Sequence, residues 1–392
     1  MVPDALEQAW TSELERQGPI TSVGEPLTEA APPAGTTVKV PVSCARGGFT
    51  LLATVTDTGQ LLALQLASPE AAQPLAAWQP PSYADPARFA EYEITLETGP
   101  RSVPGTLSLP DEPIRAAVVL LAGSGSLDRD ETIGRNKPLK DIAWGLASQG
   151  FAVVRFDKVT YTHAHDLKNA QNFTLTDEYL PQAAAAIELL IRHPATATAP
   201  VFLLGHSLGG TVAPRIAAEQ PSVAGLILLA AGAHPLHWTI VRQTRYLANL
   251  NPQTQTAAKP IIESLTEKAK RVDSTSLSPT TPADELPLGA PASYWLDLRN
   301  YDPAQLAATL DRPILILQGG RDYQATVDDD LTRWQTALAG REDVRIRVYP
   351  SLNHLFTPGQ GPSSPAEYEP EQHVDQTVIS DITDWLDTTD NH

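Results

Sequence analysis

The segment Val201-Phe-Leu-Leu-Gly-His-Ser-Leu-Gly-Gly210 decides how the rest of the chain is interpreted. Within it, an apolar run leads directly into Gly205-His-Ser-Leu-Gly209, which fits the pattern G-x-S-x-G, and a helical pattern follows. A serine at a tight turn between a strand and a helix needs very small neighbours, and Gly205 and Gly209 meet that need. We predict that Ser207 is a nucleophile at the end of a buried strand; the alternative is an ordinary glycine-rich turn.

Apolar runs and helical patterns alternate on both sides of this segment. Continuous Val, Ile and Leu runs are typical of parallel strands covered on both faces, and their alternation with helices predicts a doubly wound α/β sheet. The expected buried strands are 116–122, 152–156, 201–204, 225–230, 313–318 and 344–349, preceded by an antiparallel pair at 92–98 and 105–110. The expected helices are 139–149, 177–192, 210–219, 331–338 and 374–386.

Two regions fall outside this alternation. Residues 1–82 combine a helical pattern with strand-like stretches, which predicts a small N-terminal α+β domain, a proline-rich linker at 83–89 and a larger domain at 90–392. Between about 234 and 303, helical pieces and a Ser/Thr/Pro-rich loop interrupt the larger domain. Because ligands bind at the carboxyl edge of parallel strands, we predict that this insertion is a cap over the site. Its aromatic residues either line a pocket or pack the cap; they are Trp238, Tyr246, Tyr294 and Trp295.

Composition excludes several classes of protein. The chain has 392 residues, 46 acidic and 28 basic, with a formal net charge of −18. Binders of nucleic acid or anionic membranes normally have the opposite balance. No apolar run approaches the ~20 residues of a membrane helix, so no membrane insertion is expected. Cys44 is the single cysteine, which rules out an intrachain disulfide and a cysteine-based zinc cluster. We expect a cytoplasmic protein, or a secreted one whose signal peptide is absent from this sequence.

A serine hydroxyl is a weak nucleophile and needs a base to take its proton. The base in turn needs a carboxylate that orients it. His354 follows the last predicted strand in a loop that returns to the same sheet edge, and we expect it to be the base rather than a surface histidine. Asp322 ends the 313–318 strand after a glycine turn, so it is the expected acid. The run 328–330 offers rival aspartates, but these lie where a helix begins and where acids stabilise the helix terminus.

The other histidines are weaker candidates. The side chain of His206 should point away from the Ser207 hydroxyl. The pair His163 and His165 could bind a metal, but a third ligand is lacking, and a solvated loop is the alternative. His234 and His237 lie at the start of the cap, and we expect them to be structural or to line the pocket rather than to act as the base. We therefore expect no metal.

Stabilising the oxyanion needs two backbone N–H donors. We expect one from Leu208 and the other from Ser124, in the Gly/Ser loop after the first parallel strand; a plain turn is the alternative. The charged residues Asp128, Arg129 and Asp130 follow at once. They either pair and hold this loop in shape or form a solvated charge run.

These motifs resemble the α/β-hydrolase superfamily and, more narrowly, EstD-type bacterial carboxylesterases with a small N-terminal domain. The matching residues are 122–130, 136–138, 156–158, 205–210, 213–215, 317–324 and 353–354. Ser126 and Val159 depart from the usual pattern. The resemblance implies an α/β-hydrolase fold with an inserted cap, hydrolysis of small carboxylic esters through an acyl-enzyme, and no metal or organic cofactor.

Other functions use the same residues. One triad serves all acyl transfer, so thioesterase and amidase or exopeptidase activities stay open. A non-catalytic ligand-binding protein on this fold is the alternative from another class. The expected partner is a small-molecule ester, and homo-oligomerisation is left open.

Overall fold

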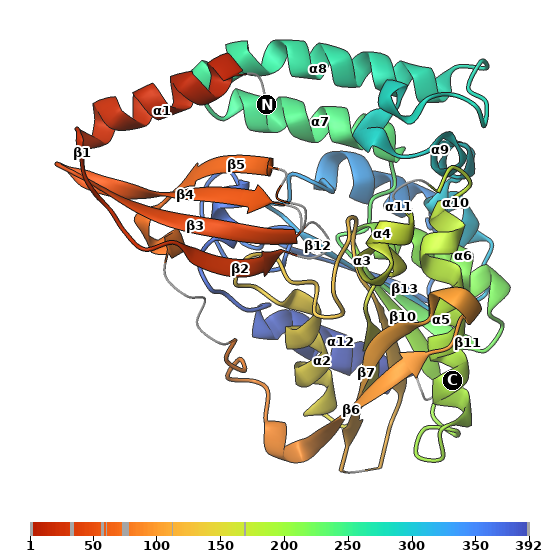
Figure 1. Ribbon diagram of the computed structural model, residues 1–392. Helices are drawn as coiled ribbons and strands as arrows, with labels where there is room; N and C mark the ends of the chain where they lie inside the picture. The colour runs from red at the N-terminus through yellow and green to blue at the C-terminus, as the bar shows by residue number, and fades with distance from the viewer. Residues whose placement is uncertain are drawn as a thin grey trace. The chain divides into compact units, whose positions relative to one another are not determined.

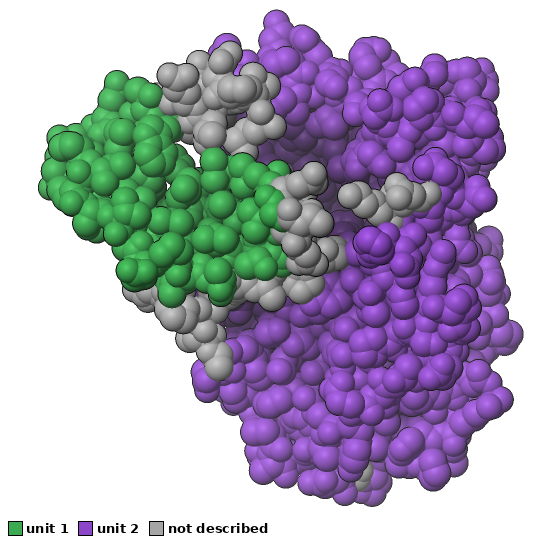
Figure 2. All heavy atoms as spheres, in the orientation of Figure 1, with its two compact units in different colours: residues 1–77 green, residues 78–392 purple. Residues whose placement is uncertain are grey.

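The computed structural model describes residues 3–31, 35–55, 59, 61–72, 78–111, 113–167 and 170–389. They form two units, Met1–Ala77 and Trp78–His392, coloured green and purple in Figure 2. This division places the predicted linker at 83–89 inside the larger unit. Residues 86–88 of this segment form a short 3-10 turn that Pro86 begins and the Asp85 side chain caps, and Phe89 already starts a strand. The segment is fixed to the larger unit because the Tyr83 hydroxyl donates to the Val374 carbonyl, and just before it the Trp78 indole N–H donates to Asp141.

The smaller unit is a helix with an antiparallel sheet, as predicted. Its elements are α1 (Pro3–Gln17), β1 (Ile20–Val23), β2 (Leu27–Ala31), β3 (Gly35–Cys44), β4 (Gly47–Val55) and β5 (Leu61–Ala67). The strand order is β1-β3-β4-β5, and β2 also pairs with β3. Trp10 of α1 meets the Phe49 ring edge-on at 5.4 Å, and Leu14 packs on the same small core.

The larger unit contains an eight-stranded sheet in the order β13-β12-β11-β10-β8-β9-β7-β6 (Figure 1). Its strands are β6 (Phe89–Leu96), β7 (Val103–Pro110), β8 (Ala117–Leu121), β9 (Ala152–Phe156), β10 (Val201–His206), β11 (Val223–Leu229), β12 (Ile314–Gly319) and β13 (Val344–Tyr349). From β9 to β13 all neighbours are parallel, while β6 and β7 form an antiparallel edge. The predicted doubly wound α/β architecture is confirmed.

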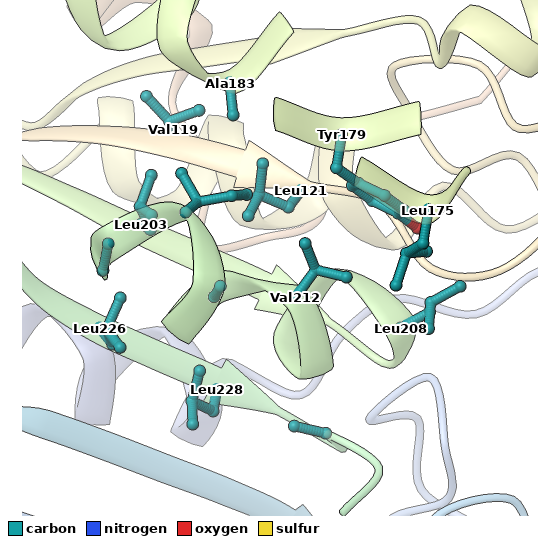
Figure 3. Close-up of a cluster of buried hydrophobic side chains, with 14 of the residues drawn as sticks. Val119, Leu121, Leu175, Tyr179, Ala183, Leu203, Leu208, Val212, Leu226 and Leu228 are labelled. Atoms are coloured by element: carbon teal, nitrogen blue, oxygen red, sulfur yellow. The ribbon is translucent and has the colours of Figure 1, made fainter. Parts of the chain in front are cut away.

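Alternate residues of the central strands face opposite sides of this sheet. On one side, Val119, Leu121 and Leu203 pack against α5 (Leu175–Arg192) and α6 (Leu208–Glu219), as Figure 3 shows. On the other side, Val118 and Leu204 pack against α2 (Pro138–Ala147) and α12 (Gln376–Thr389). Because both faces are covered, the central strands are almost wholly apolar. The buried polar exceptions are Arg155 in β9, His206 in β10 and Gln318 in β12. The edge strand β13 is the exception: it was expected to be buried, but Val348 is 38% exposed.

The cap leaves the sheet after β11 and returns before β12. It contains α7 (Leu236–Asn249), α8 (Pro252–Asp273), α9 (Ala292–Arg299) and the start of α10 (Pro303–Ala308). The pair α7 and α8 lie side by side (Figure 1). The α8 helix begins at Pro252 and continues through Pro260. None of the described helices is both long and apolar enough to cross a membrane.

Both ends of the cap are attached to one short segment of the body. At the entry, the backbone N–H groups of Ala233 and His234 donate to Asp330 Oδ1. At the exit, Arg333 donates to Asp302 over 2.6 Å. Asp330 lies in a single π-helical turn, Val327–Leu331, which leads into α11 (Thr332–Ala337).

Candidate active site

Ser207 lies at the turn between β10 and α6. Its backbone has φ 52° and ψ −119°, a conformation that L-residues adopt only where the surroundings impose it. The chain packs tightly here: a Cβ on residue 205 would lie 2.4 Å from the Gly209 backbone, and one on residue 209 would lie 2.3 Å from the Leu121 carbonyl oxygen. The two glycines are therefore required by backbone approach, as the sequence predicted for a nucleophile elbow.

Asp322 and His354 meet at the same edge of the sheet. His354 Nδ1 lies 2.7 Å from Asp322 Oδ2, and both side chains are buried. The other oxygen, Asp322 Oδ1, accepts from the backbone N–H groups of Gln324 and Ala325 at 2.7 and 3.0 Å. These donors fix the carboxylate, so the imidazole presents its Nε2 atom away from Asp322. Such a histidine can take a proton through Nε2.

The rival aspartates have other roles, and one of them differs from expectation. Asp329 is a partly exposed acid at the start of a helical turn, as predicted. Asp330 is fully buried. Its Oδ2 accepts from Arg242 Nη2 of α7 at 2.6 Å and from the Thr326 N–H at 2.9 Å. Asp330 is thus an anchor for the cap rather than a simple helix-start acid, because the peptides of the cap entry and the Arg242 side chain both converge on it.

The loop after β8 brings Ser124 beside Ser207, the candidate nucleophile. A Cβ on residue 123 would lie 3.2 Å from the Ser207 Cβ, so the Gly123 backbone passes directly against the serine. Ser124, Ser207 and Leu208 all line one cavity. The two predicted N–H donors therefore belong to segments that border the serine side chain.

A buried pair, Glu131 and His206, contacts the loop after β8 through the Gly123 backbone. Glu131 Oε1 accepts from the Gly123 N–H and lies 2.9 Å from His206 Nδ1, while His206 Nε2 lies 2.9 Å from the His354 carbonyl oxygen. Burial alone would lower the pKa of the His206 imidazole, but the adjacent Glu131 carboxylate outweighs burial and raises that pKa. Since both ring nitrogens face acceptors, the doubly protonated imidazolium is favoured. His206 therefore links the loop of Gly123 and Ser124, through Glu131, to the loop of His354.

The charge run after the loop is paired with partners in the body. Arg129 donates to Asp157 and to the Gly105 carbonyl. Asp130 accepts from Arg155 and from Lys137. Burial alone would raise the pKa of Asp130, but the charges of Arg155 and Lys137 outweigh it and hold that pKa below its ordinary value. Asp128 closes a local turn by accepting the Thr132 N–H.

The remaining histidines lie away from the serine or serve other contacts. His163 Nε2 contacts the Ser102 carbonyl oxygen, and His165 is exposed. His237 is buried beside Asp273 of α8, whereas His234 lines the cavity. Throughout the described ranges, no three His, Cys, Asp or Glu side chains are grouped as a metal site would require.

A cavity of about 570 Å³ opens over Ser207 beneath the cap. One wall comes from α7, where the aliphatic residues Leu236, Ile240 and Leu247 alternate with polar ones at 239, 243 and 244. Of the four cap aromatics, only Tyr294 is among its lining residues. Trp295 is wholly buried, Trp238 donates to Asp273, and Tyr246 stacks on Tyr323 at 5.0 Å. These three pack the cap rather than line the cavity.

Sequence reasoning gave no role to Lys158, Tyr179 or Glu131. Lys158 is the second residue after β9, so its place at the carboxyl edge of the sheet was a usable signal. Tyr179 lies within an amphipathic helix and is indistinguishable from an ordinary core aromatic. Glu131 continues an acidic run, and nothing in the sequence distinguishes this fully buried carboxylate from its partly buried neighbours.

Three comparisons with known proteins give the family. Residues 112–357 match the family described as serine aminopeptidase, S33. Esterase EstD of Thermotoga maritima is 40% identical over 310 residues, which cover 78% of this chain and 69% of that protein. The monoacylglycerol lipase of Mycolicibacterium smegmatis is 27% identical over 199 residues, covering 50% and 63% of the two chains.

Among solved structures, the Pyrococcus furiosus esterase Pf2001 is similar, with a TM-score of 0.47 and 17% identity over 81% of this chain and 96% of that one. The chain therefore belongs to the serine aminopeptidase, S33 family and is an α/β-hydrolase similar to EstD, of the carboxylesterase type.

Proposed function

We propose that this protein hydrolyses small, uncharged carboxylic esters through an acyl-enzyme on Ser207. The observation that carries the proposal is the placement of three groups at one sheet edge. Ser207 is held at a strained turn, the Asp322–His354 pair lies in the neighbouring loops, and an apolar cavity opens over the serine.

The proposed reaction follows from these positions. Ser207 Oγ attacks the ester carbonyl carbon while His354 Nε2 takes the hydroxyl proton, and the N–H groups of Leu208 and Ser124 stabilise the oxyanion. Collapse of this intermediate expels the alcohol, which receives the proton from His354. Water then attacks the acyl-enzyme with His354 again as base, and this step releases the acid and restores Ser207.

The cavity favours uncharged substrates over amino-terminal peptides. An aminopeptidase needs a free carboxylate to pair with the substrate ammonium group. Among the described lining residues, Glu178 is the single acid, and both of its oxygens are engaged. Its Oε1 lies 2.9 Å from Lys158 Nζ, and its Oε2 accepts from the Tyr294 hydroxyl at 3.1 Å. Glu178 is therefore already neutralised, which leaves the site better suited to esters.

The test compares p-nitrophenyl esters of graded acyl length with a thioester and an aminoacyl p-nitroanilide. We expect turnover of the esters, a preference set by acyl length, and kcat/KM for the anilide at least about 100-fold lower. A short pulse of ester followed by intact-mass measurement should show one acyl adduct, absent in Ser207→Ala. Faster turnover of the anilide would assign an aminopeptidase. Labelling of Ser207 by an organophosphate with no ester turnover would instead indicate a binding protein.

A further inference from the structure

A buried lysine lies behind the loop that carries the second N–H donor. Lys158 follows β9, and its ammonium donates to the Gly123 carbonyl oxygen at 2.7 Å. The Tyr179 hydroxyl lies 2.9 Å from the same oxygen, and Lys158 Nζ lies 2.9 Å from the Tyr179 oxygen. The Lys158 side chain is 2% exposed. The charged Lys158 donor thus binds this interior carbonyl oxygen, while the single Tyr179 hydroxyl hydrogen is shared between it and the Ala122 carbonyl oxygen, also at 2.9 Å.

The Gly123 carbonyl belongs to the same peptide group as the Ser124 N–H. A trans peptide is planar, and its C=O and N–H bonds point in opposite directions. Since the Gly123 oxygen points inward to Lys158, the Ser124 N–H must point outward. Ser124 lines the cavity, and the Gly123 backbone passes against Ser207. The interior contact therefore fixes which way the donor faces.

The charge also affects the donor itself. A cation on an amide oxygen draws electron density from the nitrogen, so the N–H bond becomes a stronger donor; hydrogen bonds in a chain strengthen one another in this way. Burial makes this effect larger, because water does not screen it. A second contact limits movement of the loop: the Lys158 backbone N–H donates to the Leu127 carbonyl at 3.1 Å.

We propose that Lys158 is a positioning residue for ester hydrolysis, which holds and polarises the Gly123–Ser124 peptide so that the Ser124 N–H stabilises the oxyanion. The inference rests on the proposed function. Lys158 does not touch substrate; it acts through one peptide group. Glu178 holds the ammonium in place from the other side.

Two variants test the role of Lys158, so that the test still works if one of them fails to fold. Lys158→Met leaves Glu178 buried without its cation and therefore threatens stability. The double variant Lys158→Met/Glu178→Gln removes both charges together and keeps the shape. Arg341→Met is the matched control, because Arg341 is also an ion-paired cation that donates to main-chain carbonyls, of Ala307 and Leu310, but it precedes β13 at the opposite edge of the sheet.

Removing an oxyanion donor outright costs about 10²–10³ in kcat. For loss of orientation and polarisation alone we expect kcat of the double variant to fall on the order of 10- to 100-fold, with KM changed less than about threefold. The affinity for a hexyl trifluoromethyl ketone should fall by the same factor, because Ser207 adds to that ketone and its oxygen becomes the oxyanion. A purely structural role would not couple these two losses while sparing KM.

Three results would overturn the inference. One is a double variant with kcat within twofold of Arg341→Met. Another is a loss of kcat with unchanged affinity for the ketone. The third is a loss confined to KM. Absence of ester turnover by the wild-type chain would instead refute the proposed function, and the inference with it, so the two failures are distinguishable.

Discussion

The body of the larger unit and the cap inserted into it hold their side chains by different means. In the body, the groups beside Ser207 are buried and fixed by charged hydrogen bonds, as with Asp322 on His354 and Lys158 on Gly123. In the cap, the cavity wall on α7 is made of uncharged side chains, among them aliphatic ones such as Ile240. Stabilising a developing charge needs fixed dipoles, whereas accepting an acyl chain needs only a fitting shape. Substitutions in the body should therefore change rate, and substitutions in the cap should change preference.

The largest effect should come from the nucleophile itself. Ser207→Ala removes the attacking oxygen, and loss of this group in a comparable enzyme lowers kcat by about 10⁶. Ester hydrolysis at pH 7–8 and circular dichroism should show an inactive, folded protein. Activity above a few per cent of wild type would show that the chemistry of the body does not depend on this serine.

The next effect separates Asp322 from Asp329, which both follow β12. In Asp322→Asn, the remaining oxygen can still accept from Gln324 and Ala325, which turns the amide NH₂ toward His354 Nδ1. The imidazole must then carry its proton on Nε2, where it cannot accept the serine proton, and kcat should fall by about 10⁴.

The matched control is Asp329→Asn, which removes a partly exposed acid seven residues further along. Its turnover should be nearly unchanged. If Asp329→Asn were the crippled variant and Asp322→Asn were active, the assignment of the orienting acid would be wrong.

Substitution of Asp330, at the junction between body and cap, should lower the free energy of unfolding rather than the rate of ester hydrolysis. In Asp330→Asn, the amide NH₂ replaces the oxygen that faces two donors, Arg242 and the Thr326 N–H. Removing one partner of a buried ion pair costs about 3–5 kcal/mol, and because Arg242 is partly exposed we expect about 2 kcal/mol. Urea unfolding measures this difference. Asp329→Asn should lose only a few tenths of a kcal/mol, and equal losses for both variants would contradict the anchoring role.

The smallest effect should appear in the cap, as a change of preference. Ile240→Ala enlarges the cavity over Ser207, so the ratio of kcat/KM for long and short acyl esters should rise about 10-fold. The turnover of a short ester should change less than about twofold. The control is Ile261→Ala, a substitution of the same size on α8, where the side chain is 57% exposed. A shift of equal size in the control would show that the cap acts through its stability, not its inner surface.

The same contrast explains what the sequence could predict. The core strands and the elbow follow local rules: continuous apolar runs for strands covered on both faces, and glycines where two backbone segments touch, as at Gly209. The order of Ser207, Asp322 and His354 along the chain was enough to place them at one edge, because parallel strands end together.

What the sequence missed depends on long-range pairing. The burial of Asp330 arises from contacts with Arg242, 88 residues away in the chain, and with the peptides of the cap entry. The role of Lys158 depends on a carbonyl 35 residues away. In the cap, aromatic side chains were considered as the pocket lining, yet Trp295 packs inside and aliphatic residues line the cavity, because amphipathicity indicates that a face is covered but not what covers it.

The attachment of both cap ends to one short segment has a consequence for how the cap of this chain could be replaced. Asp330 holds the entry and Arg333 holds the exit, so the inserted polypeptide begins and finishes on the same four-residue stretch. A replacement insert would restore both attachments if it supplied two entry amides, a cation in the place of Arg242 and one exit carboxylate. The cap between these two attachment points could therefore be exchanged as one unit. Such an exchange would change the substrate preference without changing the residues of the body beside Ser207.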